Sequence, residues 1–116
     1  MQDKKLEKLV NTALEDYKAL EITTLDIREM TSLADAMIIC SATSKRHAQS
    51  IAENLILKAK SRGYQPLGVE GETTGEWILI DLGDVIVHIM LKNTREFYSL
   101  EKLWTSAESI RKKYSY

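Results

Sequence analysis

Five acidic side chains fall within one stretch of this chain, and no basic side chain accompanies them. Between positions 65 and 91 there is no Lys or Arg, while the acids are Glu70, Glu72, Glu76, Asp81 and Asp84. In a chain of net charge −1, such a stretch indicates either a basic partner or a metal ion. A hard divalent cation needs several converging carboxylates. Only Asp81 and His88 are expected to be neighbours, diagonally across a hairpin, so we expect no metal and no cofactor.

Residues 41–47, SATSKRH, hold the other side chains capable of chemistry. A serine nucleophile would need the G-x-S-x-G turn, which is absent, and neither His47 nor His88 has an evident orienting partner. The sequence also lacks CxxC, HExxH, Walker and GxGxxG motifs. We therefore predict that the protein is not an enzyme. For His88 the expected hydrogen-bond partner is Asp81.

Three basic residues, Lys45, Arg46 and His47, begin a predicted helix, where the helix dipole disfavours cations. They are explained if they meet an anion, either a phosphate or an acidic side chain. The alternative is a solvated first turn, because water screens exposed charges effectively. Both interpretations stay open at this point.

The composition predicts one globular domain over residues 1–116, with 44% hydrophobic and 28% charged residues. Sixteen basic against seventeen acidic residues make a nucleic-acid coat improbable, so we expect little direct RNA contact. The single cysteine, Cys40, lies in the apolar run MIIC and is expected to be an inert core residue. No stretch is long enough to span a membrane and no leader is evident, so the predicted location is cytoplasmic.

A hairpin organises the predicted fold. Two apolar runs, residues 76–82 and 85–91, flank Gly83-Asp84, which suits a type II′ turn. Pairing Ile80 with Val87 and Ile78 with Ile89 creates a wholly aliphatic face that must be core. The other face is half apolar and half polar, and we expect it to be a surface whose cover can be removed. It carries Trp77, Leu79, Asp81, Ile86, His88 and Met90.

The remaining elements frame this hairpin. Helical spacing is found in residues 6–20 and 99–110 and in a helix that is capped at Thr43 or Ser44 and ends before Gly63. Strands are predicted at 21–28, 36–41 and 64–69. We expect an α/β fold with a mixed sheet of about five strands and helices packed on it. The passage from residue 36 to residue 69 should be a right-handed parallel crossover. The 99–110 helix and a partner protein are equally good candidates to cover Trp77.

Three motifs resemble one known family, the ribosomal silencing factors or Iojap-related proteins. They read ADAMIICSATSKRHAQSIAEN, PLGVEGETTGEWILIDLGDVIVHIM and REFYSLEKLW, and they cover most of residues 26–104 in the family's order and spacing. Two departures are Ala42, where the family usually has Gly, and Ala36, where it usually has an aromatic residue.

The resemblance implies a nucleotidyltransferase-like fold without the catalytic carboxylates. It also implies a translation repressor that binds the large ribosomal subunit through its fourteenth protein, blocks joining of the small subunit and lowers translation under nutrient limitation. An acidic stretch fits a basic ribosomal protein. By motif position and hairpin register, the expected contacts are Glu70, Glu72, Trp77, Leu79, Asp81, Asp84, His88, Met90 and Tyr98.

Two alternatives remain open. The first is a nucleotide- or RNA-binding protein of the same fold that uses the helix N-terminus at residues 41–47. The second is homodimerisation through the exposed hairpin face, which would compete with a partner.

Overall fold

The computed structural model of this protein describes residues 4–29 and 31–96. Its first seven elements follow the predicted order of helix, two strands, helix and three strands, and a short helix comes after them. They are α1 (Lys4–Asp16), β1 (Leu20–Asp26), β2 (Ala36–Ala42), α2 (Lys45–Ser61), β3 (Gly68–Glu70), β4 (Trp77–Asp81), β5 (Val85–Leu91) and α3 (Lys92–Glu96). The helix expected at residues 99–110 lies outside the described residues.

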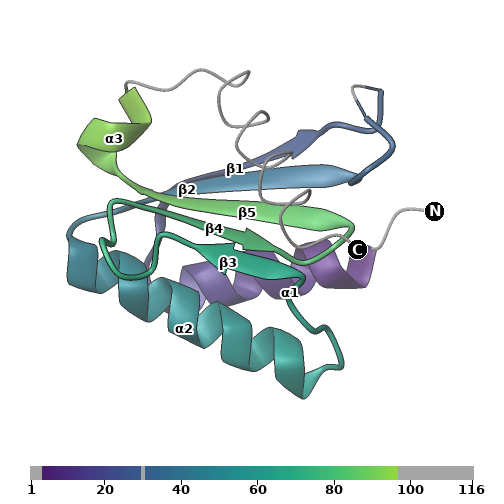
Figure 1. The fold of residues 1–116 in the computed structure, drawn as a ribbon, viewed down its shortest axis with the longest axis horizontal. Helices are drawn as coiled ribbons and strands as arrows, with labels where there is room; N and C mark the ends of the chain where they lie inside the picture. Colours follow the sequence, from purple (N-terminus) through teal and green to yellow (C-terminus); the bar gives the residue numbers. More distant parts are fainter. Residues whose placement is uncertain (1–3, 30, 97–116) are drawn as a thin grey trace.

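The five strands form one mixed sheet in the order β1-β2-β5-β4-β3. Strands β2 and β5 are parallel, and the other neighbouring pairs are antiparallel. The predicted α/β class and five-stranded mixed sheet are therefore confirmed. Strands β2 and β3, which α2 connects, run in the same direction but are separated by β5 and β4 (Figure 1).

The hairpin has the predicted register. Ile78 pairs with Ile89 and Ile80 with Val87, while the Leu82 amide donates to the Val85 carbonyl at 2.9 Å. Gly83 adopts φ 91°, the positive value that a type II′ turn requires at its first central position. The aliphatic side of the hairpin is fully buried, as the alternating pattern predicts.

Helices α1 and α2 cover one side of the sheet (Figure 1). Leu6, Val10 and Leu14 of α1 and Ile51 and Leu55 of α2 pack there against the aliphatic side of the hairpin. All seven residues of β2 are buried, because the strand lies between β1 and β5 and contributes side chains to the apolar clusters on both sides of the sheet. Cys40 is buried, as predicted for a core residue, and burial raises the pKa of its thiol to about 12.

The ends of the helices are set by local chemistry. Ser44 caps α2 by accepting from the His47 amide at 3.0 Å, and Gly63 follows its end with φ 87°. The first helix is shorter than its apolar spacing predicts. It ends at Asp16 because Lys18 takes a positive φ of 58°, which leaves Tyr17 44% exposed and lets the chain enter β1 at Leu20.

Candidate docking face

The side of the hairpin turned away from α1 and α2 is called here the hairpin face. It comprises Trp77, Leu79 and Asp81 of β4 and Ile86, His88 and Met90 of β5. Trp77 pairs with Met90 and Leu79 with His88 across the antiparallel ladder. The sequence-predicted residues on these two strands are thus brought together as expected.

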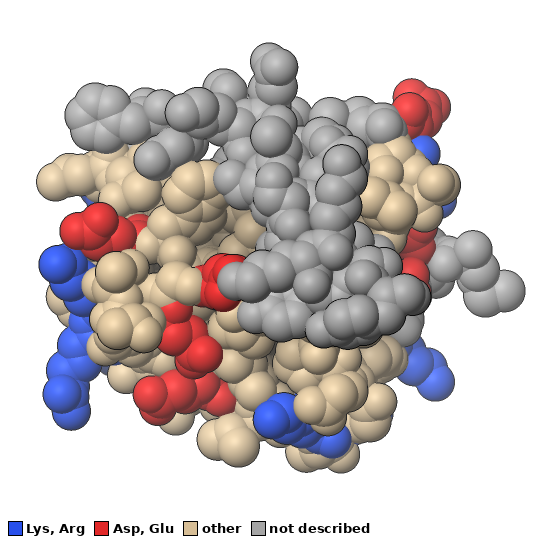
Figure 2. Space-filling model, viewed as in Figure 1, with Lys and Arg blue, Asp and Glu red and all other residues tan. Residues whose placement is uncertain are grey.

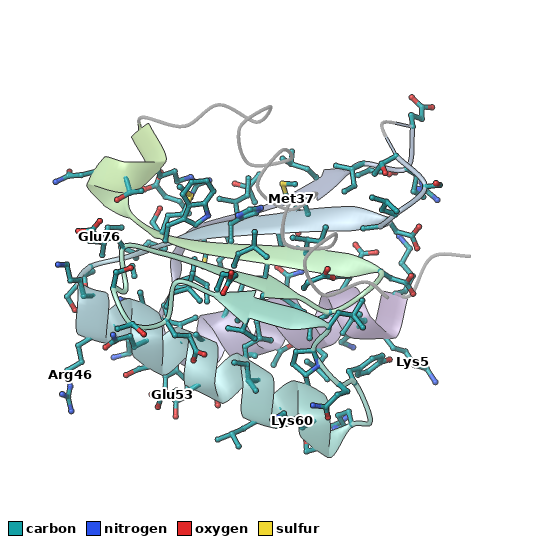
Figure 3. The ribbon with its side chains drawn as sticks, in the orientation of Figure 1. Lys5, Met37, Arg46, Glu53, Lys60 and Glu76 are labelled. Carbon is teal, nitrogen blue, oxygen red and sulfur yellow. The ribbon has the colours of Figure 1, made fainter. Side chains whose placement is uncertain are left out.

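Most of the hairpin face is buried. Trp77 is partly exposed, but the exposed fractions of Leu79, Asp81, His88 and Met90 are 5%, 1%, 0% and 0%. The side chains packed beside it come from the segment that leads into β2 and from β2 itself: Ile27, Ala34, Met37 and Ile39. Figure 3 shows Met37 on the side of the sheet away from the labelled side chains of α2. The protein therefore has a second apolar cluster, separate from the core beneath the helices.

Trp77 and His88 form the polar centre of this face. The indole N–H of Trp77 donates to Nδ1 of His88 at 2.9 Å, and the ring centroids lie 5.9 Å apart. Because an indole nitrogen can only donate, Nδ1 must accept, and a neutral imidazole then carries its proton on Nε2. The prediction that Asp81 is the hydrogen-bond partner of His88 was wrong, since His88 bonds to Trp77, its other diagonal neighbour.

Asp81 has a structural position at the end of β4. Its carboxylate accepts from the Gly83 amide at 2.9 Å, which stabilises the tight turn. Because the Asp81 carboxylate bonds to the turn, on the opposite diagonal from Trp77, it does not accept a hydrogen bond from His88. Asp81 is also buried rather than part of an exposed acidic rim.

His88 is a fully buried polar side chain with one atom unused. Burial lowers the pKa of its imidazole to about 3, because desolvation disfavours the charged ring. Its Nε2 atom has no hydrogen-bond partner within the described part of the chain. A buried donor without an acceptor costs about 1–3 kcal/mol, so such groups are rare in proteins.

The acidic residues lie beside one end of the hairpin face and at its turn. Glu70 is the last residue of β3 and is partly buried, Glu72 and Glu76 are exposed in the loop before β4, and Asp84 is exposed at the turn. Figure 2 shows acidic side chains gathered over this loop and the adjoining part of α2 and β3. Asp84 is separated from them by the length of the hairpin.

The loop at residues 71–76 packs against α2. The Gln49 amide donates to the Glu72 carbonyl at 2.8 Å, and the Gly75 amide donates to the Gly71 carbonyl at 3.0 Å. A Cβ atom at Gly71 would overlap the Trp77 carbonyl oxygen, and one at Gly75 would lie 2.9 Å from Lys45 Cβ. Both glycines are therefore required by close packing, in addition to their positive φ values.

The first turn of α2 is engaged within the protein itself. Lys45 pairs with Glu76 across 3.5 Å, so an acidic side chain meets this cation. The Thr43 amide donates to His47 Nδ1 at 3.0 Å, and His47 Nε2 lies 2.7 Å from the Tyr17 carbonyl oxygen, to which it donates. His47 thus joins the end of α1 to the start of α2.

Arg95 is a structural residue that the sequence did not reveal. Its guanidinium donates to the Glu21 carbonyl oxygen at 2.8 Å, Ser41 Oγ at 3.0 Å and Thr23 Oγ1 at 3.2 Å. It therefore joins α3 to β1 and β2. The only signal was its place in the REFYSLEKLW motif. Tyr98, the remaining expected contact, lies outside the described residues.

Within residues 4–29 and 31–96, no three His, Cys, Asp or Glu side chains are placed as a metal site would require. No helix in the same ranges is both long and apolar enough to cross a bilayer.

Comparison with known proteins gives consistent matches over nearly the whole chain. The sequence profile of the family described as "Ribosomal silencing factor during starvation" matches residues 2–115. The chain is 46% identical to ribosomal silencing factor RsfS of Haemophilus influenzae, over 78% of this chain and 89% of that protein. A mouse protein named mitochondrial assembly of ribosomal large subunit protein 1 is 34% identical over 79% of this chain and 42% of its own length.

Solved structures agree with these sequence matches. A crystal structure of a Chromobacterium violaceum protein superposes with a TM-score of 0.84 at 40% identity, covering 90% of this chain and 88% of that one. A Bacillus halodurans structure gives a TM-score of 0.80 at 36% identity, covering 88% and 95%.

Proposed function

The chain belongs to the ribosomal silencing factor family, and we propose that it binds the large ribosomal subunit through its fourteenth protein and sterically blocks joining of the small subunit. In this role it is a non-enzymatic repressor that acts in the cytoplasm and lowers translation when nutrients are scarce. The family match supports the ribosomal role. The binding partner and the steric mechanism are the proposal.

The observation that carries the proposal is the chemistry of the hairpin face. Leu79, Ile86 and Met90 form a buried apolar cluster, and Trp77 packs on it as the partly exposed member of the face. An aromatic side chain on an apolar support is typical of the centres of protein interfaces. Large aromatic side chains at such centres commonly dominate binding energy. Trp77 is the member of this face that is partly exposed, so we place it at the first point of contact.

The partner surface should be basic. Glu70 and Glu72 lie beside the Trp77 end of the hairpin face, and the Gln49 amide holds the loop at Glu72. Glu76 is already paired with Lys45. Fixed acidic groups beside an apolar patch accelerate encounter with a basic protein and fix its orientation. The proposed contacts are Glu70, Glu72, Trp77, Leu79, Asp81, Asp84, His88, Met90 and Tyr98. Of these, Asp81, His88 and Met90 have almost no exposed surface in the free protein, so Asp81 contributes chiefly by holding the turn and the other two by supporting Trp77.

No observation favours nucleotide binding at the start of α2. Lys45 is paired with Glu76, and His47 uses both ring nitrogens within the protein. A phosphate at this helix end would have to displace these contacts. The second alternative, a homodimer through the hairpin face, would bury Trp77 and therefore compete with ribosome binding.

The decisive experiment is sucrose-gradient sedimentation of purified ribosomal subunits under joining conditions, with wild-type protein, Trp77→Ala and Leu57→Ala. Leu57 is 68% exposed on α2, away from the hairpin face, and serves as the matched control. We expect wild type and Leu57→Ala to migrate with the large subunit and reduce joined particles. Trp77→Ala should remain at the top of the gradient while folded by circular dichroism.

The proposal fails if wild-type protein leaves the joined particles undiminished. It also fails in its assignment of the face if folded Trp77→Ala blocks joining as well as wild type does. Sedimentation equilibrium of free wild type and Trp77→Ala reports whether the same face forms a homodimer.

A further inference from the structure

A basic cleft lies between α1 and α2, on the side of the sheet opposite the hairpin face. It has a volume of about 560 Å³ and is lined by Lys5, Lys8, Leu9, Thr12, Lys58, Arg62 and Tyr64. Four of these side chains are cationic and none is a carboxylate. In a chain of net charge −1, this is a strong local excess of positive charge.

Helix electrostatics explain only half of these cations. Lys58 and Arg62 lie at the C-terminal end of α2, where cations interact favourably with the free carbonyl groups. Lys5 and Lys8 lie at the N-terminal end of α1, where the same effect is unfavourable. Figure 1 shows that α1 begins and α2 ends on the same side of the molecule, so packing brings both pairs of cations to one cleft.

Few carboxylates neutralise this charge. Lys58 pairs with Asp16 at 3.3 Å, with both side chains about half exposed. Within the described residues, Lys5, Lys8 and Arg62 form no ion pair, and all three are exposed. Neighbouring like charges repel one another, and a bound polyanion would relieve that repulsion.

We propose that the basic cleft binds the phosphodiester backbone of RNA. The cations come from two helices and are exposed, which suits a chain of phosphates in solvent better than one buried anion. The choice of RNA as the polyanion rests on the proposed ribosomal function. The cleft contains none of the large exposed apolar side chains of the described surface, which a membrane-binding surface would need.

This inference revises the sequence-based expectation of little RNA contact. That expectation used the net charge, which averages over the whole chain. Figure 3 shows Lys5 and Lys60 toward one end of the helical layer and Arg46 at the other end of α2. The cleft therefore differs from the RNA-binding site considered at the start of α2.

The test is fluorescence anisotropy of a short labelled RNA hairpin, titrated with full-length protein at several salt concentrations. The variants are Lys8→Gln/Arg62→Gln in the cleft and Lys45→Gln/Arg46→Gln as a control of equal charge change. We expect the cleft variant to lose at least about tenfold in affinity. The negative slope of log K against log salt should become less steep by about 1.5, because two phosphate contacts disappear. The control should match wild type.

Three outcomes overturn the proposal: the cleft variant binds RNA as tightly as wild type, the control loses as much affinity, or wild type binds no RNA. If wild type binds phosphatidylserine vesicles but no RNA, and the cleft variant does not bind the vesicles, the cleft is assigned to a membrane instead. Circular dichroism of each variant confirms that the fold persists.

Failure of this inference and failure of the proposed function are distinguishable. Trp77→Ala leaves the cleft unchanged, so it should bind the RNA hairpin like wild type while losing the block to subunit joining. If Trp77→Ala still blocks joining, the docking face is wrong but the cleft is unaffected. If the cleft variant binds RNA like wild type while Trp77→Ala loses the block to subunit joining, the cleft is wrong and the docking face stands.

Discussion

The indole N–H of Trp77 donates a 2.9 Å hydrogen bond to Nδ1 of His88, so the only partly exposed residue of the hairpin face fixes the tautomer of its buried histidine. The proton of a neutral His88 then lies on Nε2, which has no acceptor within the described residues. The hydrogen bond thus joins Trp77, the proposed binding anchor, to His88, whose imidazole is kept neutral by burial.

The first prediction is that His88 makes the stability of the protein depend on pH. Its pKa is about 3 in the folded state and near the ordinary 6.5 when unfolded. As the pH falls from about 6.5 toward 3, the unfolded state binds a proton that the folded state does not, so the free energy of unfolding decreases. The decrease approaches about 1.4 kcal/mol for each pH unit.

Urea denaturation between pH 7 and pH 4 measures this effect against His88→Gln, whose carboxamide oxygen can accept the Trp77 indole proton but does not titrate. We expect a shallower pH dependence for His88→Gln than for wild type. Equal slopes for the two proteins would show that His88 does not contribute. Nitrogen-15 NMR of the wild-type ring should report a proton on Nε2 throughout this range.

The second prediction concerns Met90. Its side chain is fully buried beside Trp77, so Met90→Ala removes packing as well as any contact with a partner. The expected loss is about 2–5 kcal/mol in the free energy of unfolding. Leu57→Ala, at a position 68% exposed, should change it by no more than about 0.5 kcal/mol.

This expected loss changes how Met90 can be used. Since the side chain has no exposed surface, a loss of ribosome binding in Met90→Ala would mix two causes. Trp77→Ala is the cleaner test of docking, and a stable Met90→Ala protein would contradict the packing described here.

The third prediction separates steric from conformational demands at glycine. Gly71 and Gly63 have nearly equal φ values, 88° and 87°. A Cβ atom at Gly71 would overlap the Trp77 carbonyl oxygen, whereas a Cβ atom at Gly63 would have no heavy atom within 4 Å beyond its two chain neighbours. Gly63→Ala should therefore cost only the backbone strain, about 1 kcal/mol. Gly71→Ala should cost clearly more and should displace the loop that carries Glu72 and Glu76.

Thermal unfolding of the two alanine variants measures the difference. We expect the lower melting temperature for Gly71→Ala and, in the same protein, a change in the fluorescence of the adjacent Trp77. Identical melting temperatures would mean that the loop shifts without cost.

The register of the hairpin could be predicted because two local signals agree. Gly83-Asp84 specifies a tight turn, and a period of two places Ile78 and Ile80 on one side. A shift by one residue would expose those side chains to water. The partner of His88 could not be predicted, since Trp77 and Asp81 lie on the two diagonals and only the turn contact of Asp81 decides between them.

Relationships between distant segments were also beyond the sequence. The apolar pattern identifies β2 and β3 as strands, but nothing in either indicates that β5 and β4 separate them. The basic cleft depends in the same way on how α1 packs against α2. Lys8 and Arg62 are 54 positions apart, so their proximity follows from tertiary structure alone.

The fourth prediction is that Arg95 stabilises the irregular start of β1. The pairing of β1 with β2 shifts between Leu20 and Thr23, and Glu21 adopts a positive φ of 48°. Arg95 donates to the carbonyl oxygen of Glu21 and to the hydroxyl groups of Thr23 and Ser41. Its planar fork holds these three acceptors together, which the single ammonium group of Lys cannot reproduce.

Arg95→Lys should therefore lower the free energy of unfolding by about 2 kcal/mol, since charge-assisted hydrogen bonds are lost beside the fully buried Ser41. Hydrogen exchange locates the effect. The amides of β1 should lose protection, while those of β4 and β5 change only with the global stability. Arg46→Lys, at an exposed position, is the matched control and should behave like wild type. Uniform loss of protection over all strands would instead mean that Arg95 supports the whole sheet rather than the strained entry to β1.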